Sequence, residues 1–539
     1  MSPVRAAQQE FDYVIVGGGS AGCVLANRLS ADPAHRVLLL EAGEEDSHLA
    51  IKIPAGTSRL PKKYNWMFPT SPDPTRAGKA DEYSSGKVLG GSSSINMMFW
   101  VRGEKSDFDG WRDRGCSGWG WDDLLPYFRK VERYTDGPAP LRGDAGPVHV
   151  RQQDLRLEVV DDFVTAAQQA GHPFNPDFNG ERQQGVALAQ VSQRRGLRAS
   201  TSTAYLRPVR KRRNLTVLTS AFVTKVRIVD GRAVGVEYTR DGAAHVAAAA
   251  REVIVSAGAL TSPKLLMLSG VGPADHLREH GVEVVVDRPA VGANLQEHSY
   301  GMLVYRTEAN TLYEELRPLK MLRHGLNFIL RRKGALTVAG GAAVIFSQLV
   351  GERPTEAETI LMPIGLSFGD GEGEHGIHDV KISPHGFMVY PSFVHPSGRG
   401  SVRLASADPS QPAAITHHLL GDGDVATLIQ ACREARRIMG QPAMAAKKVV
   451  ETMPGVEVQT DEQWAGYLAR VAFRPYHPSG TCRMGADDDA VVDPQLRVRG
   501  VQGLRVVDTS IFPDLTSGNT NAPTIVVAEK AADMILSAR

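Results

Sequence analysis

Residues 11–43 read FDYVIVGGGSAGCVLANRLSADPAHRVLLLEAG, and this stretch decides the fold. Residues 13–16 and 37–40 are short apolar runs, which are typical of strands buried on both faces. Residues 23–29 carry apolar side chains at helical spacing between those two runs. The stretch therefore predicts a strand, a crossover helix and a second parallel strand.

Three glycines, Gly17, Gly19 and Gly22, follow the first strand as G-x-G-x-x-G. In a dinucleotide-binding turn such glycines allow a tight turn, close approach of the backbone to a pyrophosphate, and close packing of helix on strand. The helix N-terminus would direct its free N–H groups at the phosphates. Glu41, 19 residues after Gly22, is placed to accept hydrogen bonds from a ribose. A plain βαβ unit is the alternative, but the register of all four features favours dinucleotide binding.

The composition limits the class of protein. With 539 residues the chain should hold two or three domains, and 42% hydrophobic with 22% charged residues argues against disorder. Lys and Arg number 61 against 60 Asp and Glu, and the resulting net charge of +1 argues against a nucleic-acid partner. The four cysteines form no C-x-x-C pair, so we expect neither a disulfide scaffold nor a cysteine-built zinc site.

The sequence also bears on location. No run approaches the roughly 18 apolar residues of a spanning helix, and the N-terminus MSPVRAAQQE lacks the apolar core of a secretory signal. We therefore expect a cytoplasmic protein without a transmembrane segment. Peripheral attachment to a membrane surface stays open at this stage.

Further strand patterns are spread along the chain. Residues 215–229 and 231–238 alternate around the turn Asp230-Gly231 and predict a hairpin, and 251–259 and 504–508 predict two more strands, the last followed by a helix at 524–536. We expect an α/β protein: a Rossmann-like dinucleotide-binding domain built from discontinuous segments, plus an α+β substrate domain with an antiparallel sheet. The predicted limits are 1–150, 213–299 and 471–539 for the first domain, and 151–212 and 300–470 for the second.

Four longer segments carry a resemblance to a known family. They are GKVLGGSSSINMMFWVRGEKSDFD (86–109), GALTSPKLLMLSGVG (258–272), YHPSGTCRMG (476–485) and GNTNAPTIVVAEKAADMI (518–535). Together with the N-terminal motif they make the chain similar, over nearly its whole length, to the glucose–methanol–choline (GMC) oxidoreductases, and within them to bacterial choline-dehydrogenase-like members. The resemblance implies FAD as cofactor and oxidation of an alcohol as the activity.

The resemblance also implies which residues contact FAD. The segment 86–96 is rich in Gly and Ser, which lets backbone N–H groups approach a cofactor, although by itself it could be an ordinary loop. Ile95 stands where some relatives carry the histidine that binds the flavin covalently, so non-covalent FAD is expected. The expected FAD contacts are Gly17, Gly19, Ser20, Ala21, Gly22, Glu41, Ala42, Trp66, Val88, Gly90, Gly91, Asn96, Met97, Val223, Asp508 and Ala522.

Alcohol oxidation removes a proton from oxygen and a hydride from carbon, and the flavin N5 is expected to accept the hydride. A histidine is a natural proton acceptor near neutral pH. His477 lies in the HPSGT segment, and Asn521 follows 44 residues later, as in the family's His/Asn pair. We therefore predict His477 as the base and Asn521 as its partner on the substrate oxygen. Alone, His477 could be structural, and Asn521 could simply cap a helix.

The substrate expected from this reading is a neutral primary alcohol, aromatic or medium-chain aliphatic, that is oxidised to its aldehyde. In choline-dehydrogenase-like relatives a glutamate precedes an A-G-G stretch, and Val338 stands at that position here. An apolar pocket of Val338, Ala342, Ala343 and Phe346 is expected, with Asn65 and Tyr476 as further pocket residues, although Asn65, Trp66 and Tyr476 could equally belong to the core.

Several alternatives stay open. They are a choline-type dehydrogenase, a flavin-containing lyase, and a fatty-acid photodecarboxylase, against which the presence of His477 counts. The electron acceptor is O₂ or a quinone or dye. The sequence indicates neither the oligomeric state nor the physiological alcohol. The acidic run 487–489 lacks the spacing of a calcium loop, so no metal site is expected.

Overall fold

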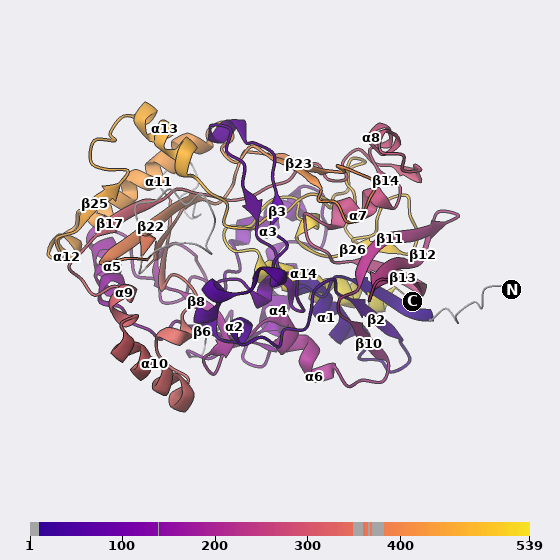
Figure 1. Cartoon of the computed structure of the whole chain (residues 1–539), viewed down its shortest axis with the longest axis horizontal. Helices are drawn as coiled ribbons and strands as arrows, with labels where there is room; N and C mark the ends of the chain where they lie inside the picture. The colour runs from indigo at the N-terminus through magenta and orange to yellow at the C-terminus, as the bar shows by residue number, and fades with distance from the viewer. Residues whose placement is uncertain (1–9, 138, 349–358, 365–366, 369–381, 539) are drawn as a thin grey trace.

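Two seven-stranded sheets organise the chain in the computed structural model, which describes residues 10–137, 139–348, 359–364, 367–368 and 382–538 (Figure 1). The first sheet has the order β10-β2-β1-β13-β12-β11, and β26 pairs with β13. Its strands are β1 (Glu10–Val16), β2 (Val37–Leu40), β10 (Leu215–Leu218), β11 (Phe222–Val229), β12 (Arg232–Arg240), β13 (Ala243–Val255) and β26 (Leu504–Val506). β10, β2, β1, β13 and β26 run parallel, and β11 to β13 form an antiparallel meander.

The N-terminal stretch forms the predicted βαβ unit. β1 and β2 pair in parallel, and every residue of β2 is buried, as expected of a strand that is covered on both faces. The crossover helix α1 (Ser20–Leu29) packs on α14 (Asn521–Ser537), the long C-terminal helix. The prediction of a Rossmann-like unit built from separated segments is therefore confirmed.

The second sheet is antiparallel, with the order β25-β17-β22-β19-β18-β7 and β16 paired with β22. Its strands are β7 (Gly185–Leu188), β16 (Ser299–Tyr300), β17 (Leu303–Arg306), β18 (Ala343–Ser347), β19 (Thr359–Ile364), β22 (Gly386–Phe393) and β25 (Val450–Met453). The helices α5 (Glu158–Gln169), α11 (Asp424–Met439) and α13 (Asp461–Val471) lie beside it on the left of Figure 1.

The side-chain alternation of the second sheet separates two environments. Leu361 and Val389 belong to the core that the helices close, whereas Met362, Met388 and Tyr390 pack in a separate cluster on the other side. The antiparallel substrate sheet that the sequence predicts is confirmed, and its second face is available to line a site.

Shorter elements connect these layers. The remaining α-helices are α2 (Leu49–Lys52), α3 (Lys105–Asp113), α4 (Trp121–Val131), α6 (Arg207–Val209), α7 (Ser262–Leu268), α8 (Ala274–Glu279), α9 (Leu312–Glu315), α10 (Pro318–Arg331) and α12 (Pro442–Ala445). Short strands outside the two sheets are β3 (Phe68–Pro69), β4 (Glu82–Tyr83), β5 (Glu132–Tyr134), β6 (Val148–Gln152), β8 (Gln190–Arg194), β9 (Leu197–Arg198), β14 (Val271–Gly272), β15 (Val286–Asp287), β20 (Ser367–Phe368), β21 (Ile382–Ser383), β23 (Gly400–Arg403) and β24 (Ala414–His417). Within the described residues, no helix is both long and apolar enough to cross a membrane.

Local expectations met different outcomes. The hairpin at Asp230-Gly231 is present, and both residues have the positive φ, 50° and 72°, that such a turn uses. Residues 215–229 do not run as one continuous strand into this hairpin, because Ser220, with φ 53°, separates β10 from β11. The last helix begins at Asn521 rather than at 524. The domain limits stay a prediction, and β16 falls on the limit drawn between 299 and 300.

Gly22→Ala tests the contact that closes the βαβ unit. A β-carbon on Gly22 would lie 1.9 Å from the carbonyl oxygen of Gly17, so α1 would have to move off β1. We expect a loss of about 1–3 kcal/mol in the free energy of unfolding of the apoprotein, measured by denaturant titration. Gly110→Ala in α3 is the matched control: its β-carbon meets nothing within 4 Å and should stabilise the helix slightly. Equal stability of the two variants would contradict this packing.

Candidate active site

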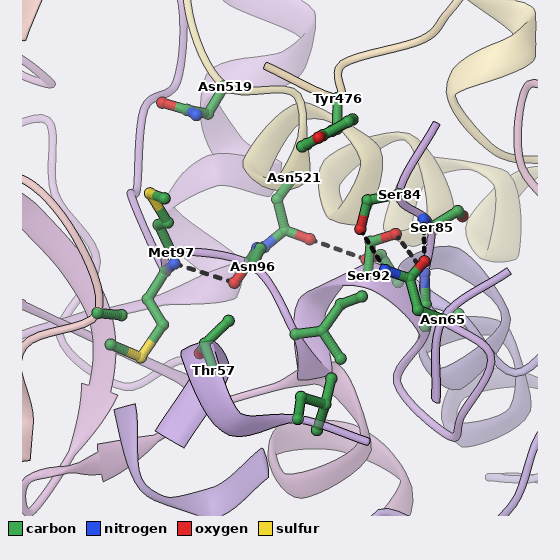
Figure 2. A pocket seen from close by; sticks show the side chains of 18 of the residues that line it. Thr57, Asn65, Ser84, Ser85, Ser92, Asn96, Met97, Tyr476, Asn519 and Asn521 are labelled. Carbon is green, nitrogen blue, oxygen red and sulfur yellow. Dashed lines mark hydrogen bonds between the residues drawn. The ribbon is translucent and has the colours of Figure 1, made fainter. Parts of the chain in front are cut away.

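A cavity of about 930 Å³ extends from the carboxyl ends of β1 and β2 to the inner face of the second sheet. Val16 and Leu40 line it at one side, and Met362 and Tyr390 line it at the other. Ligands of open parallel sheets bind outside the carboxyl ends of the strands, so the position agrees with a dinucleotide site. Figure 2 shows Asn96, Met97, Asn519 and Asn521 around one part of this cavity and Asn65, Ser84 and Ser85 at another.

Two glycine turns approach each other closely at the cavity wall. Gly19 is the N-cap of α1 and makes no side-chain cap, so the first N–H groups of the helix are free for an anion. Gly91 lies opposite, and a β-carbon on it would stand 2.7 Å from the α-carbon of Gly19. Gly17, Gly19, Ser20, Ala21 and Gly91, all predicted FAD contacts, line the cavity, and their contact with the cofactor stays a prediction.

Glu41 lies at the end of β2 with its carboxylate inside the protein. Its Oε2 accepts from the N–H of Gly18 at 2.7 Å, and its Oε1 accepts from the N–H of Gly43 at 2.7 Å. Burial raises the pKa of Glu41 to about 7, although these two hydrogen bonds favour the charged form. Because each oxygen has lone pairs left, the carboxylate can also accept from hydroxyl groups of a ligand.

Other predicted cofactor residues also line the cavity: Ala42, Trp66, Asn96, Met97, Val223 and Asp508. The Asp508 carboxylate accepts from the N–H of Gly258 at 2.9 Å and from the Ser262 hydroxyl at 2.6 Å, and burial raises its pKa. Gly22, Val88, Gly90 and Ala522 are not among the described residues that line the cavity, and their contact with FAD stays a prediction. Gly22 packs α1 on the turn, and Val88 is completely buried.

Arg198, which no sequence motif marks, holds the Gly- and Ser-rich loop in place. Its guanidinium donates to the carbonyl oxygen of Asn96 at 2.6 Å and to the Asn96 Oδ1 at 2.8 Å. It also donates to the carbonyl oxygens of Ile51 and Ser93. Burial lowers the pKa of Arg198 to about 9, and no described carboxylate offsets this effect. The cation thus fixes the loop through neutral acceptors alone.

His477 is buried on the cavity wall and is held through its backbone. Residues 296–300 pair with residues 473–479, through Gln296 with Ser479 and Tyr300 with Phe473. This pairing brings His298 beside His477, and their Nδ1 atoms lie 2.9 Å apart. The N–H of His477 donates to Glu297 Oε1 at 2.7 Å, which fixes the main chain at this point.

The hydrogen bonds determine which nitrogen of His477 carries the proton. His298 Nε2 lies 3.1 Å from the carbonyl oxygen of Val394, which can only accept, so this nitrogen is protonated. Burial lowers the pKa of His298 well below its usual value and that of His477 to about 4, so both rings are neutral. His298 Nδ1 therefore accepts from His477 Nδ1–H. The Nε2 of His477 is left unprotonated and faces the cavity.

Asn519 is the side chain that meets this nitrogen. Its Nδ2 lies 2.9 Å from His477 Nε2 and donates to it. Asn521, the predicted partner of His477 on the substrate oxygen, makes its hydrogen bond to a residue other than this histidine, and its contact with a substrate stays a prediction. Asn521 begins α14, and its Oδ1 accepts instead from the hydroxyl of Ser20 at 2.8 Å, on the glycine-rich turn. Both asparagines line the cavity, with Asn519 toward His477 and Asn521 toward α1.

The second sheet gives its part of the cavity an apolar wall. Met97, Val338, Ala342 and Met362 line it together with the rings of Tyr300, Tyr390 and Phe473. Phe473 packs edge-on against both tyrosines, with ring centroids at 5.7 and 5.0 Å. The prediction of Phe346 as a pocket residue is wrong, because its ring packs against Phe178 in a closed cluster. Ala343 likewise lies in the core.

Two further predicted pocket residues lie on the opposite wall. Asn65 accepts from the N–H of Ser85 at 2.9 Å and donates to the hydroxyl of Ser84 at 2.6 Å (Figure 2). Tyr476 precedes the buried histidine with φ 68°, a conformation that few non-glycine residues adopt. Such strain is common at functional sites, and here it turns the chain at the cavity wall.

Glu297, His298 and His477 also have the spacing of a metal site, the single such group among the described residues. Their ligand atoms are already engaged, however. The two histidine Nδ1 atoms share a hydrogen bond, and Glu297 Oε1 accepts from the N–H groups of both histidines. Glu297, His298 and His477 therefore form a hydrogen-bonded unit, and the absence of a metal ion stays a prediction.

The sequence reading missed Asn519, His298 and Arg198. The sequence could have indicated Asn519, because it stands two residues before Asn521 in the same NTN segment. His298 and Arg198 carry no local signal, because they matter through contacts with residues 179 and 102 positions away.

Comparisons with known proteins agree with this geometry. Residues 11–300 and 396–528 match two family models, both described as GMC oxidoreductase. An oxygen-dependent choline dehydrogenase of Sinorhizobium medicae is 40% identical over 532 residues, covering 97% of this chain and 95% of that protein. The structure is similar to pyridoxine 4-oxidase from Mesorbium loti, with TM-score 0.85 and 30% identity over 97% and 98% of the two chains. It is also similar to a fungal aryl-alcohol oxidase, with TM-score 0.85 and 26% identity over 98% and 99%.

Glu41→Gln tests the electrostatics of the dinucleotide end. The folded apoprotein holds the Glu41 proton up to a pKa of about 7, whereas the unfolded chain releases it near 4.5. Stability from this group is therefore complete below pH 4.5 and is lost as the pH rises through 7, by about 3 kcal/mol. Relative to wild type, Glu41→Gln should gain this amount between pH 4.5 and 7.5 in denaturant titrations. The exposed Glu283→Gln is the control and should parallel wild type. A constant difference between Glu41→Gln and wild type would refute the assignment.

Proposed function

The chain belongs to the GMC oxidoreductase family, and on that premise we propose that it oxidises a neutral primary alcohol, aromatic or medium-chain aliphatic, to the aldehyde. Membership makes it an FAD-dependent oxidoreductase acting on CH–OH groups. The single observation that carries the proposal is the unprotonated Nε2 of His477, held at the cavity wall beside the donor Asn519.

The residues around the cavity fit FAD. The uncapped N-terminus of α1 and the facing Gly91 suit a pyrophosphate, and the Glu41 carboxylate suits a ribose. Asn96, Met97 and Asn521 would hold the flavin side, and Ile95, which also lines the cavity, gives no nucleophile for a covalent link. When bound, the flavin supplies the acceptor for the hydride of the alcohol.

His477 would act as the proton acceptor. Its Nε2 can accept a hydrogen bond from a substrate hydroxyl and then take the proton. Because burial lowers the pKa of His477 to about 4, the ring remains in its neutral, accepting form throughout the neutral range. His298 acts as a positioning residue, since its Nδ1 keeps the proton of His477 on the far nitrogen.

Asn519 would hold the same substrate oxygen. Its Nδ2 carries two N–H groups, and in the free site one of them donates to His477 Nε2. A substrate hydroxyl between the two side chains would donate to the imidazole and accept from the amide. This arrangement orients the oxygen and stabilises the negative charge that grows on it as the proton leaves.

The apolar wall supports a neutral substrate. Among the described lining residues the acids are Glu41 and Asp508, and both follow strands of the first sheet. The wall formed by the second sheet thus carries no described carboxylate that could meet an ammonium group. An alkyl or aryl substituent would pack against Met362, Tyr390 and Phe473 instead.

Choline is the second candidate, and a specific observation favours it. Tyr300, Tyr390 and Phe473 place three aromatic rings on one wall, and such rings can bind a trimethylammonium group without a carboxylate. The 40% identity to oxygen-dependent choline dehydrogenases points the same way.

Anaerobic mixing of the purified holoenzyme with a panel of alcohols tests this proposal. Benzyl alcohol and octan-1-ol should bleach the flavin absorbance and yield aldehyde, with second-order rate constants at least about tenfold above that of choline. A dominant rate with choline would replace the neutral alcohol by the second candidate. If no alcohol in the panel bleaches the flavin, the proposed redox role itself is refuted.

Asn519→Ala separates the two asparagines. It should slow anaerobic flavin reduction by about 100-fold, the typical effect of removing one donor to a developing oxyanion, and leave the FAD content unchanged. Asn521→Ala is the matched control, because it removes the same type of side chain two positions further along the chain. It should alter FAD retention more than the reduction rate, because the partner of Asn521 is Ser20. The opposite pattern would return the catalytic role to Asn521.

A further inference from the structure

Helix α10 (Pro318–Arg331) exposes an unusual amount of apolar side chain. Five aliphatic residues on it are open to solvent: Leu319 84%, Leu322 63%, Leu326 53%, Ile329 69% and Leu330 78%. At 100° per residue these positions fall on one stripe of the helix. Figure 1 shows α10 projecting at the lower left edge of the molecule, away from both sheets. The stripe therefore faces outward without a partner in the described chain.

The orientation of α10 is fixed by its opposite face. His324 and Phe328 are the buried residues of the helix, and they lie on the side away from the stripe. The Nε2 of His324 lies 2.7 Å from the Glu315 carboxylate, and its Nδ1 accepts from the N–H of Ala335 at 3.2 Å. These contacts anchor α10 to the segments before and after it, so the stripe cannot simply rotate inward.

The charges around the stripe have one sign. Residues 316–333 contain six Lys and Arg residues and neither Asp nor Glu, in a chain whose net charge is only +1. Lys320 pairs with Glu315 at 2.7 Å and Arg332 stacks on Phe328, whereas Arg317, Arg323, Arg331 and Lys333 form no ion pair within the described chain. An exposed aliphatic stripe bordered by cations is typical of helices that lie in the surface of an anionic membrane.

We propose that α10 docks the protein onto an anionic lipid bilayer, with the stripe inserted among the acyl chains and the basic residues at the headgroups. With 14 residues, about 21 Å at 1.5 Å per residue, the helix is suited to lie in the surface rather than to cross it. A second copy of the chain is a poorer occupant, because symmetric pairing through α10 would bring the same cations together.

Docking at α10 would also place the cavity beside the lipid. Leu312, Leu316 and Met321, at the junction of α9 and α10, line the cavity, and Leu316 is at the same time 37% exposed. The cavity therefore reaches the surface next to the docking helix. A reactant dissolved in the bilayer would meet its entrance directly.

Sedimentation of the holoenzyme with vesicles tests the proposal. Phosphatidylcholine vesicles containing phosphatidylglycerol should bind the protein, vesicles of phosphatidylcholine alone should bind it at least about tenfold more weakly, and added salt should weaken binding. The double variant Leu322→Gln/Ile329→Gln should lose at least about tenfold in vesicle binding and keep its turnover of a water-soluble alcohol with a soluble dye.

Matched variants keep the test specific. Val229→Gln/Val456→Gln removes two exposed aliphatic side chains elsewhere and should bind like wild type. Arg323→Gln/Arg331→Gln should weaken binding to the anionic vesicles, whereas Lys211→Gln/Arg213→Gln, with the same change of charge at another exposed site, should not. Equal binding of the α10 variants and wild type would overturn the proposal. So would a dimer in solution that Leu322→Gln/Ile329→Gln converts to a monomer.

Discussion

The hydrogen bond between the Nδ1 atoms of His298 and His477 is the constraint on which the site depends. Two neutral imidazoles can share one proton between these atoms in either direction, and the carbonyl oxygen of Val394 decides the direction from the far side. Only then does His477 present a basic nitrogen to the cavity and accept from Asn519. A backbone oxygen with no chemistry of its own thus determines which nitrogen of His477 is free to accept a proton.

Burial and backbone geometry maintain this arrangement. Both rings are buried, and this lowers the pKa of each, so neither is protonated in the neutral range. Glu297 accepts from the N–H groups of both histidines, and it ties their main chains together at the point where residues 296–300 pair with 473–479. Burial likewise raises the pKa of Glu297, to about 8, so the proton on its carboxyl group reduces the cost of burying charge here.

The sequence predicted what local patterns encode and failed where distant contacts decide. Residues 11–43 specify strand, turn, helix and acid in one short unit, and their structure follows the pattern closely. The spacing of 44 residues between His477 and Asn521 does not say which side chain contacts the histidine. That contact depends on where α14 begins. Because Asn521 is the first residue of α14, Asn519 in the preceding turn makes the contact with His477. Phe346 fits an apolar pocket by type, but strand alternation turns it toward Phe178.

The proposed proton acceptor and the apolar wall of the cavity lie in separate structural layers. His298, His477 and Asn519 lie on irregular segments that are held by backbone pairing and by the turn before α14. Met362 and Tyr390 lie on strands of the second sheet, where Leu361 and Val389 point into the helix-covered core. Strand alternation lets the cavity-facing residues change without disturbing that core. The side chains of that wall can therefore change while the histidine pair and its hydrogen bonds stay intact. On the proposed function, the apolar and aromatic character of the wall is the physical basis of specificity.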